Sequence, residues 1–246
     1  MPSRYEQQIE QELKAWQLKM LGKPSLFDRL SKRLQNRVNK IIPEKVHEAI
    51  TVTIKQMIRG VLFGAQATTS KFEKDVSLQV RDALSQEKIS FYQKTAAAEG
   101  GITGAGGLLL GLADFPILIG IKLKLLFELA NIYGYDTIDY KERLYILYIF
   151  QLAFSSPQHR KKIYLKIANW NNVQTELPQD IHQFDWRNLQ QEYRDYIDIA
   201  KMAQLIPVIG APVGAIVNYR LIRKLGITVM NAYRLRRLHG GKSLLT

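Results

Sequence analysis

The chain has 246 residues, of which 46% are hydrophobic and 23% are charged, so it can bury a sizeable core and is not globally disordered. Its 35 Lys and Arg residues against 22 Asp and Glu give a formal net charge of +13, which favours an anionic partner such as lipid or nucleic acid. The sequence has no cysteine, which excludes disulfides, thiol catalysis and cysteine-ligated metal centres.

The N-terminal 20 residues predict an amphipathic helix. Ile9, Leu13, Trp16 and Met20 recur at the spacing of one helical face. Charged residues occupy the positions where a secretory signal would have its apolar core, so we expect no cleaved leader. We therefore expect the protein to stay on the side of the membrane where it is made.

Apolar residues at helical spacing also run from Ile42 to Ala65, with Pro43 at a first-turn position. No stretch alternates apolar and polar residues cleanly over six positions, and no Asn-Gly or Asp-Gly turn occurs. We therefore predict an all-α fold. Further helical patterns cover residues 72–97, 116–133, 139–155, 157–169, 185–204 and 213–238.

We predict a single helical domain over residues 1–246, with a glycine-rich apolar helical hairpin at its centre. Its N-terminal part, residues 1–70, would consist of amphipathic basic helices. The polar stretch 171–185, which contains Pro178, predicts a surface loop within the domain. The C-terminal part, residues 205–238, would be an apolar Pro/Gly element followed by a basic helix.

Residues 96–121 combine many glycines with an apolar, nearly uncharged sequence. Gly100, Gly104, Gly107 and Gly111 recur at i, i+4, i+7 and i+11, so on one continuous helix they would share a face. A face without side chains lets another backbone approach closely, as small residues do between membrane helices. The alternative is a flexible glycine loop that feeds a helix, because paired glycines are also typical of a helix end.

The close-packing interpretation predicts how substitutions behave. A methyl group at Gly104 or Gly107 would have no room, so alanine there would destabilise the fold. Alanine at Ser85 or Gln86, two positions of the preceding helical pattern that we expect to be exposed, would be nearly neutral.

The same segment has the length of a membrane span, but it contains Asp114, and Pro116 lacks the N–H that a helix interior needs. We therefore expect the helix to break at 114–116 and residues 96–136 to form a hairpin, either buried in protein or dipping into one leaflet. Asp114 would cap the helix that begins at Pro116. A phosphate-binding loop is disfavoured, because the required Gly-Lys-Ser/Thr ending is absent.

A second apolar element, residues 205–217, contains two prolines together with Gly210 and Gly214. It is too short to span a bilayer, so we predict a buried or re-entrant element. Because Gly210 and Gly214 are four residues apart, they offer a small-residue surface against which the first glycine run could pack.

The sequence resembles the EcsC protein family in residues 99–136 (EGGITGAGGLLLGLADFPILIGIKLKLLFELANIYGYD) and 206–236 (IPVIGAPVGAIVNYRLIRKLGITVMNAYRLR). The family takes its name from a protein encoded beside an ABC transporter in Gram-positive bacteria. The resemblance therefore implies a bacterial, cytoplasm-facing protein associated with a membrane transport system. It brings no agreed enzymatic activity and no catalytic residues to carry over.

The C-terminal residues from 201 onward carry eight Lys or Arg and no Asp or Glu. Cations beside an apolar element are typical of a surface that binds anionic cytoplasmic lipid, although a solvated basic surface of a soluble bundle would show the same charges. Nucleic acid is disfavoured as the anion, because the aromatic residues follow apolar helical patterns and no RNA-recognition signature occurs. The predicted lipid-binding residues are Arg220, Arg223, Lys224, Arg234, Arg236 and Arg237.

Catalytic and metal-binding motifs are absent from the sequence, and we expect no cofactor and no metal. The leading hypothesis is a non-enzymatic accessory protein of bacterial transport or envelope physiology. It would be cytoplasmic, peripherally bound to the inner face of the cell membrane, and in contact with anionic lipid or an ABC transporter. The alternative is an unrecognised enzyme, such as a lipid-directed hydrolase, that uses Glu99 and Asp114. Convergence of these carboxylates with the cations at 220–224 in one pocket would favour the enzyme.

Overall fold

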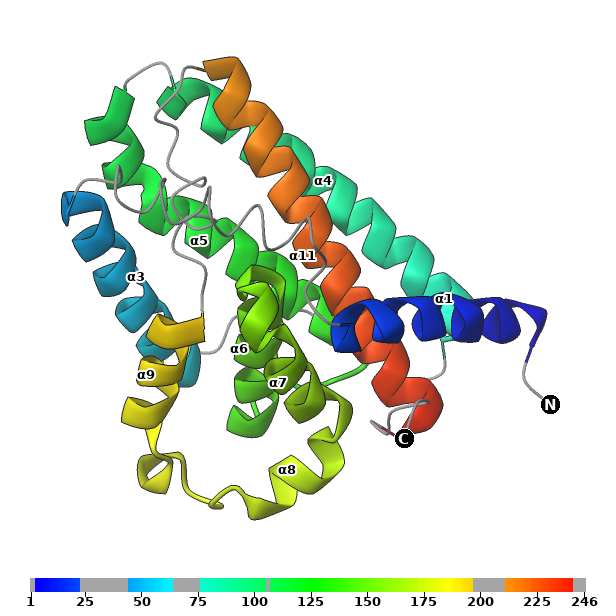
Figure 1. Ribbon diagram of the computed structural model, residues 1–246. Helices are drawn as coiled ribbons and strands as arrows, with labels where there is room; N and C mark the ends of the chain where they lie inside the picture. The colour runs from blue at the N-terminus through cyan, green and yellow to red at the C-terminus, as the bar shows by residue number, and fades with distance from the viewer. Residues whose placement is uncertain (1–2, 23–43, 64–75, 105–106, 197–210, 241–246) are drawn as a thin grey trace.

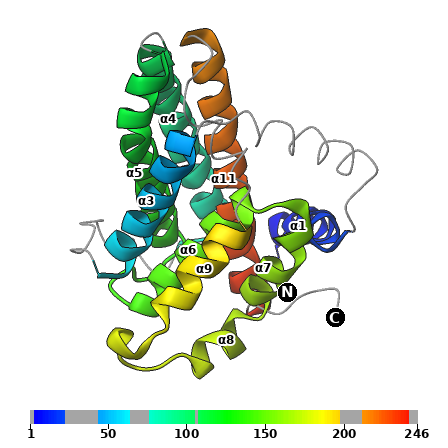
Figure 2. The same cartoon turned by 60° about the vertical axis from the view of Figure 1, so that its left-hand side comes forward.

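The computed structural model describes residues 3–22, 44–63, 76–104, 107–196 and 211–240, which are mostly helical and contain no strand (Figures 1 and 2). The prediction of an all-α fold is therefore confirmed. In chain order the elements are α1 (Arg4–Leu21), α3 (Glu44–Phe63), α4 (Leu78–Gly104), α5 (Gly107–Ile132), α6 (Tyr140–Phe154), α7 (Pro157–Ala168), α8 (Trp170–Glu176), the 3-10 helix η1 (Ile181–Gln183), α9 (Trp186–Tyr196) and α11 (Ala211–His239).

Three long helices, α4, α5 and α11, run side by side along the length of the molecule (Figure 1). Only residues 105–106 separate α4 from α5, which folds back against it. The most extensive helix contact joins α4 to α11. These two helices are antiparallel, because Gln93 donates to the Tyr219 carbonyl (3.4 Å) while Asp82, near the start of α4, meets Arg234 near the end of α11.

The predicted hairpin forms, but its turn lies earlier in the chain than we expected. The backbone is helical to Gly104 and again from Gly107, and Pro116 lies inside α5. A proline in a helix interior costs about 3 kcal/mol, yet the adjacent Phe115 and the nearby Leu118 are fully buried in the core. Tertiary packing thus outweighs the local preference for a break. Asp114 consequently lies well inside α5 and does not cap a helix start.

The four glycines that we expected on one helical face belong to two helices. Gly100 and Gly104 end α4, whereas Gly107 and Gly111 begin α5. The prediction of a single-helix stripe is therefore wrong, because the chain reverses between the two pairs. Their close-packing role remains a prediction.

The second small-residue surface is described only in part. Gly214 lies in the first turn of α11, whereas Gly210 is outside the described residues. The pairing of this surface with the glycine-rich hairpin stays a prediction. Among the helices of the described ranges, none combines the length and the apolar character that crossing a membrane requires.

Helix α6 lies at the centre of the core, in contact with α3, α5, α7 and α11 (Figure 2). Nearly every one of its side chains is buried, as is typical of a helix that is apolar all round. Asp139 caps its N-terminus by accepting a hydrogen bond from the Lys141 N–H (2.9 Å). The predicted helix over 139–155 is confirmed.

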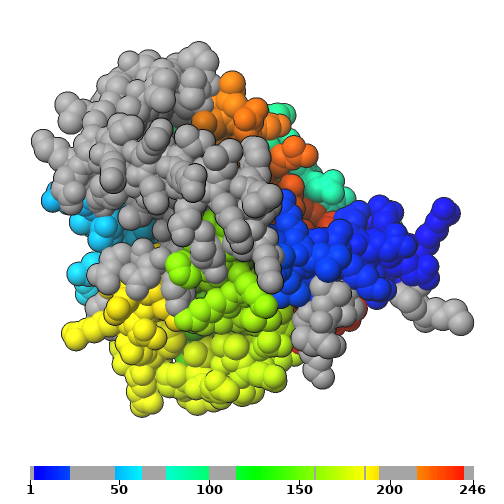
Figure 3. All heavy atoms as spheres, in the orientation of Figure 1, coloured from blue at the N-terminus to red at the C-terminus, as the bar shows by residue number. Residues whose placement is uncertain are grey.

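Helix α1 begins with a capping box. The Ser3 hydroxyl accepts from the Glu6 N–H (3.2 Å), and the Glu6 carboxylate accepts from the Ser3 N–H (2.7 Å). The N-terminal end of the helix stands out from the body of the molecule (Figure 3), while its remainder packs on α7 and α11. The predicted apolar face is confirmed as buried: Ile9, Leu13, Trp16 and Met20.

Two local expectations are wrong. The stretch 171–185 is not a loop throughout, because α8 continues to Glu176. Trp170 anchors this helix, with its buried ring 5.0 Å from the Tyr145 ring. Ser85 is fully buried, because its side of α4 faces the core, whereas Gln86 is exposed as expected.

Candidate anion-binding site

A groove of about 430 Å³ lies between α1, α11 and the junction of α6 with α7. We call it the basic groove. Its apolar side chains include those of Trp16, Met20 and Leu152. Five cations accompany them, from α1, α7 and α11, and no acidic side chain of the described residues lines it. The cations are Lys19, Arg160, Arg220, Arg223 and Lys224.

Helix α11 positions three of these cations by its periodicity. Arg220, Arg223 and Lys224 are three and four residues apart and therefore share one face of the helix, and all three are exposed. The residues between them, Leu221 and Ile222, are buried against the core. The sequence predicted these three cations as lipid-binding residues, and the structure brings them together at one groove.

Arg160 and Lys19 complete the cationic set and were not predicted. Arg160 comes from α7, where its Nη2 donates to the Gly22 carbonyl at the end of α1 (3.4 Å). Its Nε–H is buried and has no hydrogen-bond partner among the described residues. A buried donor without a partner is costly.

The other predicted lipid-binding residues lie elsewhere. Arg234 is 8% exposed and forms ion pairs with Asp82 (3.0 Å) and Glu12 (3.2 Å). Arg236 is 12% exposed and pairs with Glu142 (2.5 Å). Their assignment to a lipid-binding surface is wrong, because the C-terminal half of α11 is covered by α1, α4 and α6.

Arg237 is exposed, but one of its guanidinium nitrogens, Nη1, donates to the Tyr133 carbonyl (3.0 Å). It does not line the basic groove. The predicted C-terminal cations therefore separate into an exposed group at 220–224 and an inner group at 234–236, with Arg237 at the surface beyond them.

The partners of Arg234 form a buried cluster around Asp82. The Asp82 carboxylate accepts hydrogen bonds from the hydroxyls of Tyr5 (2.6 Å) and Tyr133 and from Arg234 Nε (3.0 Å). Burial, together with the hydrogen bond to Asp82, raises the pKa of Tyr5 to about 12, and burial raises the pKa of Tyr133 well above its usual value. Both tyrosines therefore remain protonated donors at neutral pH. This cluster ties α1, α4, the end of α5 and α11 together.

A second cluster surrounds Glu142 of α6. Its carboxylate accepts from the Tyr233 hydroxyl (2.7 Å) and from Arg236, whose guanidinium lies 4.1 Å from the centre of the Tyr135 ring. Burial raises the pKa of Glu142, and the charge of Arg236 opposes that rise. Because these groups saturate one another, we interpret both clusters as ties between helices rather than as reactive sites.

Of the two carboxylates of the enzyme hypothesis, the structure describes the side chain of Glu99 alone, and it does not reach the basic groove. Glu99 is half-buried near the end of α4 and does not line the groove. Asp114 is described only by its backbone, inside α5. Across the described part of the chain, no group of three His, Asp or Glu side chains could hold a metal ion.

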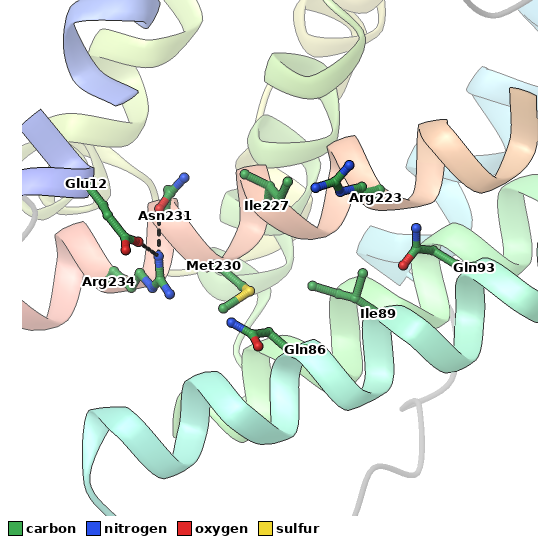
Figure 4. Close-up of a pocket in the computed structure, with 9 residues that line it drawn as sticks. All are labelled: Glu12, Gln86, Ile89, Gln93, Arg223, Ile227, Met230, Asn231 and Arg234. Atoms are coloured by element: carbon green, nitrogen blue, oxygen red, sulfur yellow. Dashed lines mark hydrogen bonds and ion pairs between the residues drawn. The ribbon is translucent and has the colours of Figure 1, made fainter. Parts of the chain in front are cut away.

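A polar hollow of about 410 Å³ adjoins the basic groove. We call it the polar chamber (Figure 4). It lies where α1, α4 and α11 meet, and Arg223 and Ile227 line both it and the groove. Figure 4 shows side chains of α4 and α11 facing each other across it. Its remaining lining residues are Glu12, Gln86, Ile89, Gln93, Met230, Asn231 and Arg234.

Comparison with known proteins agrees with the resemblance seen in the sequence. The profile of the EcsC protein family matches residues 7–238. The chain is 45% identical to "Protein EcsC" of Bacillus subtilis (strain 168), over 94% of this chain and 95% of that protein. It is 26% identical to "Uncharacterized protein YdbA" of the same strain, over 97% and 96% of the two chains. No solved structure was found to match. The match of the family profile across nearly the whole chain, with a relative of this identity, shows that the protein belongs to the EcsC family.

Proposed function

We propose that the protein is a non-enzymatic accessory protein of a bacterial transport system that binds anionic lipid at the inner face of the cell membrane. The observation that carries the proposal is the basic groove, in which five cations border apolar side chains and no acidic side chain of the described residues intervenes. Membership of the EcsC family supports the transport context that the resemblance implies.

The exposed face of α11 supports the same function. Ile216, Tyr219, Arg220, Arg223 and Ile227 follow one another at helical spacing, and all five are exposed. Ile216 is 52% exposed and Tyr219 is 44% exposed. Apolar and aromatic side chains among cations on one helix face are typical of a helix that lies in the membrane interface.

The strength of such binding can be estimated from the number of cations. Each cation near an anionic surface contributes about 1 kcal/mol, so the three cations of α11 together contribute about 3 kcal/mol. That energy corresponds to about a 100-fold change in affinity. This electrostatic attraction weakens as salt rises, because dissolved ions screen the charges. The Debye length is about 8 Å at physiological ionic strength and shorter at higher salt.

Sedimentation with lipid vesicles tests the proposal. We expect the protein to bind vesicles that contain anionic lipid, more weakly as salt rises, and to bind neutral vesicles poorly. The triple variant Arg220→Gln/Arg223→Gln/Lys224→Gln should lose about 100-fold in affinity. Equal binding to neutral and anionic vesicles would contradict the proposal.

A matched control separates the groove from the net charge of the protein. Lys55, Arg59 and Lys124 are exposed on α3 and α5, and none of them lines the groove. Replacing these three with Gln lowers the net charge equally, and we expect vesicle binding to remain within a few-fold of the parent protein. An equal loss of vesicle affinity in both triple variants would mean that the net charge of a solvated basic surface, and not the groove, causes the binding.

A further inference from the structure

We propose that the basic groove and the polar chamber together bind one phospholipid whose phosphodiester carries a hydroxylated headgroup. The phosphate would lie at Arg223, the apolar chain in the groove and the hydroxyl groups in the chamber. This inference rests on the proposed function, because the membrane supplies the ligand, and it adds which class of lipid the site selects.

Arg223 is the point at which the two hollows meet. It lines both the groove and the chamber, as does the neighbouring Ile227. A guanidinium presents a planar fork of donors that matches the oxygens of a phosphate. Arg220 lies one turn before Arg223 on α11, and Lys224 follows it directly. Both add positive charge on the groove side. A phosphate at this junction would leave its two ester substituents to point in opposite directions, one into each hollow.

The two hollows differ in chemistry on either side of that junction. The groove side presents Trp16, Met20, Leu152 and Ala153, which suit an acyl chain. The chamber adds the amide side chains of Gln86, Gln93 and Asn231 to the apolar side chains of Ile89, Ile227 and Met230. Gln86 and Gln93 project from α4 toward α11, as Figure 4 shows. The amide nitrogen of Gln93 donates to the Tyr219 carbonyl (3.4 Å), so Gln93 offers a ligand its carbonyl oxygen as an acceptor.

The amides of the chamber suit neutral hydroxyl groups. An amide both donates and accepts hydrogen bonds, as a hydroxyl does. Asn231, on the α11 side, accepts from Arg234 Nη1 (3.2 Å) through its Oδ1, which leaves its amide nitrogen as the donor available to a ligand.

The charges that line the chamber argue against a second anionic group on the headgroup of the lipid. Glu12 lines it, and its carboxylate is held by Arg234 (3.2 Å), which is itself paired with Asp82. The inner end of the chamber is therefore close to neutral, and among the described residues that line it the cation without an acidic partner is Arg223 at the junction. A singly charged phosphodiester with hydroxyl groups fits this arrangement better than a lipid with two phosphates.

Two soluble lipids test the headgroup directly. Dihexanoyl-phosphatidylglycerol and dihexanoyl-phosphatidylethanol have the same chains and the same single negative charge, but only the first carries headgroup hydroxyls. Titration calorimetry on the full chain, below the micelle concentration of each lipid, should show about tenfold tighter binding of phosphatidylglycerol, since a site built to bond a hydroxyl discriminates against the analogue without it. Equal affinities, or no binding of either lipid, would overturn the inference.

Variants assign the preference to the chamber. Gln86→Ala, at an exposed position, and the double variant Gln86→Ala/Gln93→Ala should lose the preference but bind phosphatidylethanol as the parent protein does. Arg223→Gln should weaken binding of both lipids. The control Gln56→Ala/Gln191→Ala changes exposed amides outside both hollows and should change neither affinity. A preference that persists in both chamber variants would overturn the inference.

The outcomes separate this inference from the proposed function. If vesicle binding depends on anionic lipid but the two soluble lipids bind equally, membrane contact stands and the selective site is wrong. If phosphatidylglycerol binds selectively while the protein ignores vesicles, the site stands and membrane contact is wrong.

Discussion

Helices α4 and α11 approach so closely at Gly226 that the structure leaves no space for a methyl group. A Cβ atom at this position would lie 2.5 Å from both Cγ1 and Cδ1 of Ile89, and 3.1 Å from its Cγ2. Isoleucine has two branches on its Cβ and one strongly preferred χ1 rotamer in a helix, so rotating the side chain cannot clear all three contacts. Alanine at 226 therefore has to push the two helices apart.

Two opposing effects determine how much Gly226→Ala changes the free energy of unfolding. Overpacking a core costs about 1–3 kcal/mol, whereas alanine in a helix gains about 1 kcal/mol over glycine through its lower backbone entropy in the unfolded chain. Because three atoms of Ile89 clash, we expect the cost to lie in the upper part of its range and the net destabilisation to be about 1–2 kcal/mol. For a chain of this length that lowers the Tm of Gly226→Ala by roughly 2–8 °C.

Thermal melts of the purified variants measure this effect against two matched controls. Gly60 in α3 and Gly120 in α5 lie within helices, and no other described residue comes within 4 Å of an added Cβ at either position. Alanine at either position should raise stability by about 0.4–1 kcal/mol. The sign of the effect should thus reverse between position 226 and the controls.

A second substitution tests whether the clash is the cause. Ile89→Ala removes all three clashing atoms, so Gly226→Ala in that background should cost much less than in the parent protein, which a double-mutant cycle measures. A Gly226→Ala protein that melts at or above the parent temperature, or strictly additive effects in the cycle, would refute the reasoning.

Burial lowers the pKa of Lys122 to about 7 in the folded protein, whereas in the unfolded chain it stays near 10.4. The unfolded state then binds more protons between these values, so urea denaturation should show stability rising from pH 7 to pH 9 by up to about 1.4 kcal/mol per pH unit, and Lys122→Met should remove that gain. Asp82→Asn leaves the Arg234 charge buried with a weaker partner and should cost about 3–5 kcal/mol in denaturant melts; Glu12→Gln, at the half-exposed partner, should cost less than about 1 kcal/mol. Ser3→Ala removes the cap of α1 and should cost about 1 kcal/mol, seen as faster amide hydrogen exchange in the first turns of α1.

The faces of single helices are predictable from the sequence because they depend on spacing alone. Ile9, Leu13 and Trp16 of α1 repeat with the helical period, and the structure buries all of them. The same holds for the apolar face of α3, on which Ile50 and Ile58 are buried. The cations at 220–224 are likewise neighbours on one face of α11, so a local pattern was sufficient to find that part of the basic groove.

Buried ion pairs leave no such local signal. Arg234 lies 152 residues from Asp82 in the chain, and Arg236 lies 94 residues from Glu142. In the sequence these arginines look the same as Arg220, because nothing in their neighbourhood reveals a carboxylate brought in by another helix. Arg160 was also missed, because it reaches the basic groove from α7 and nothing near it in the sequence links it to the cations of α11.

The sequence by itself determined that the chain is helical, which faces of α1 and α3 are apolar and where the cations of α11 cluster, because periodicity and charge are properties of neighbouring residues. Only the tertiary structure decided that Pro116 lies inside a helix, since burial of its neighbours outweighs the lost backbone hydrogen bond. It also decided that α4 and α11 approach closely at Gly226, where an added Cβ would meet Ile89. Whether a glycine is closely approached depends on which helix packs against it. The helices α4 and α11 that meet here lie more than 100 residues apart in the chain, so the sequence around Gly226 does not reveal the contact.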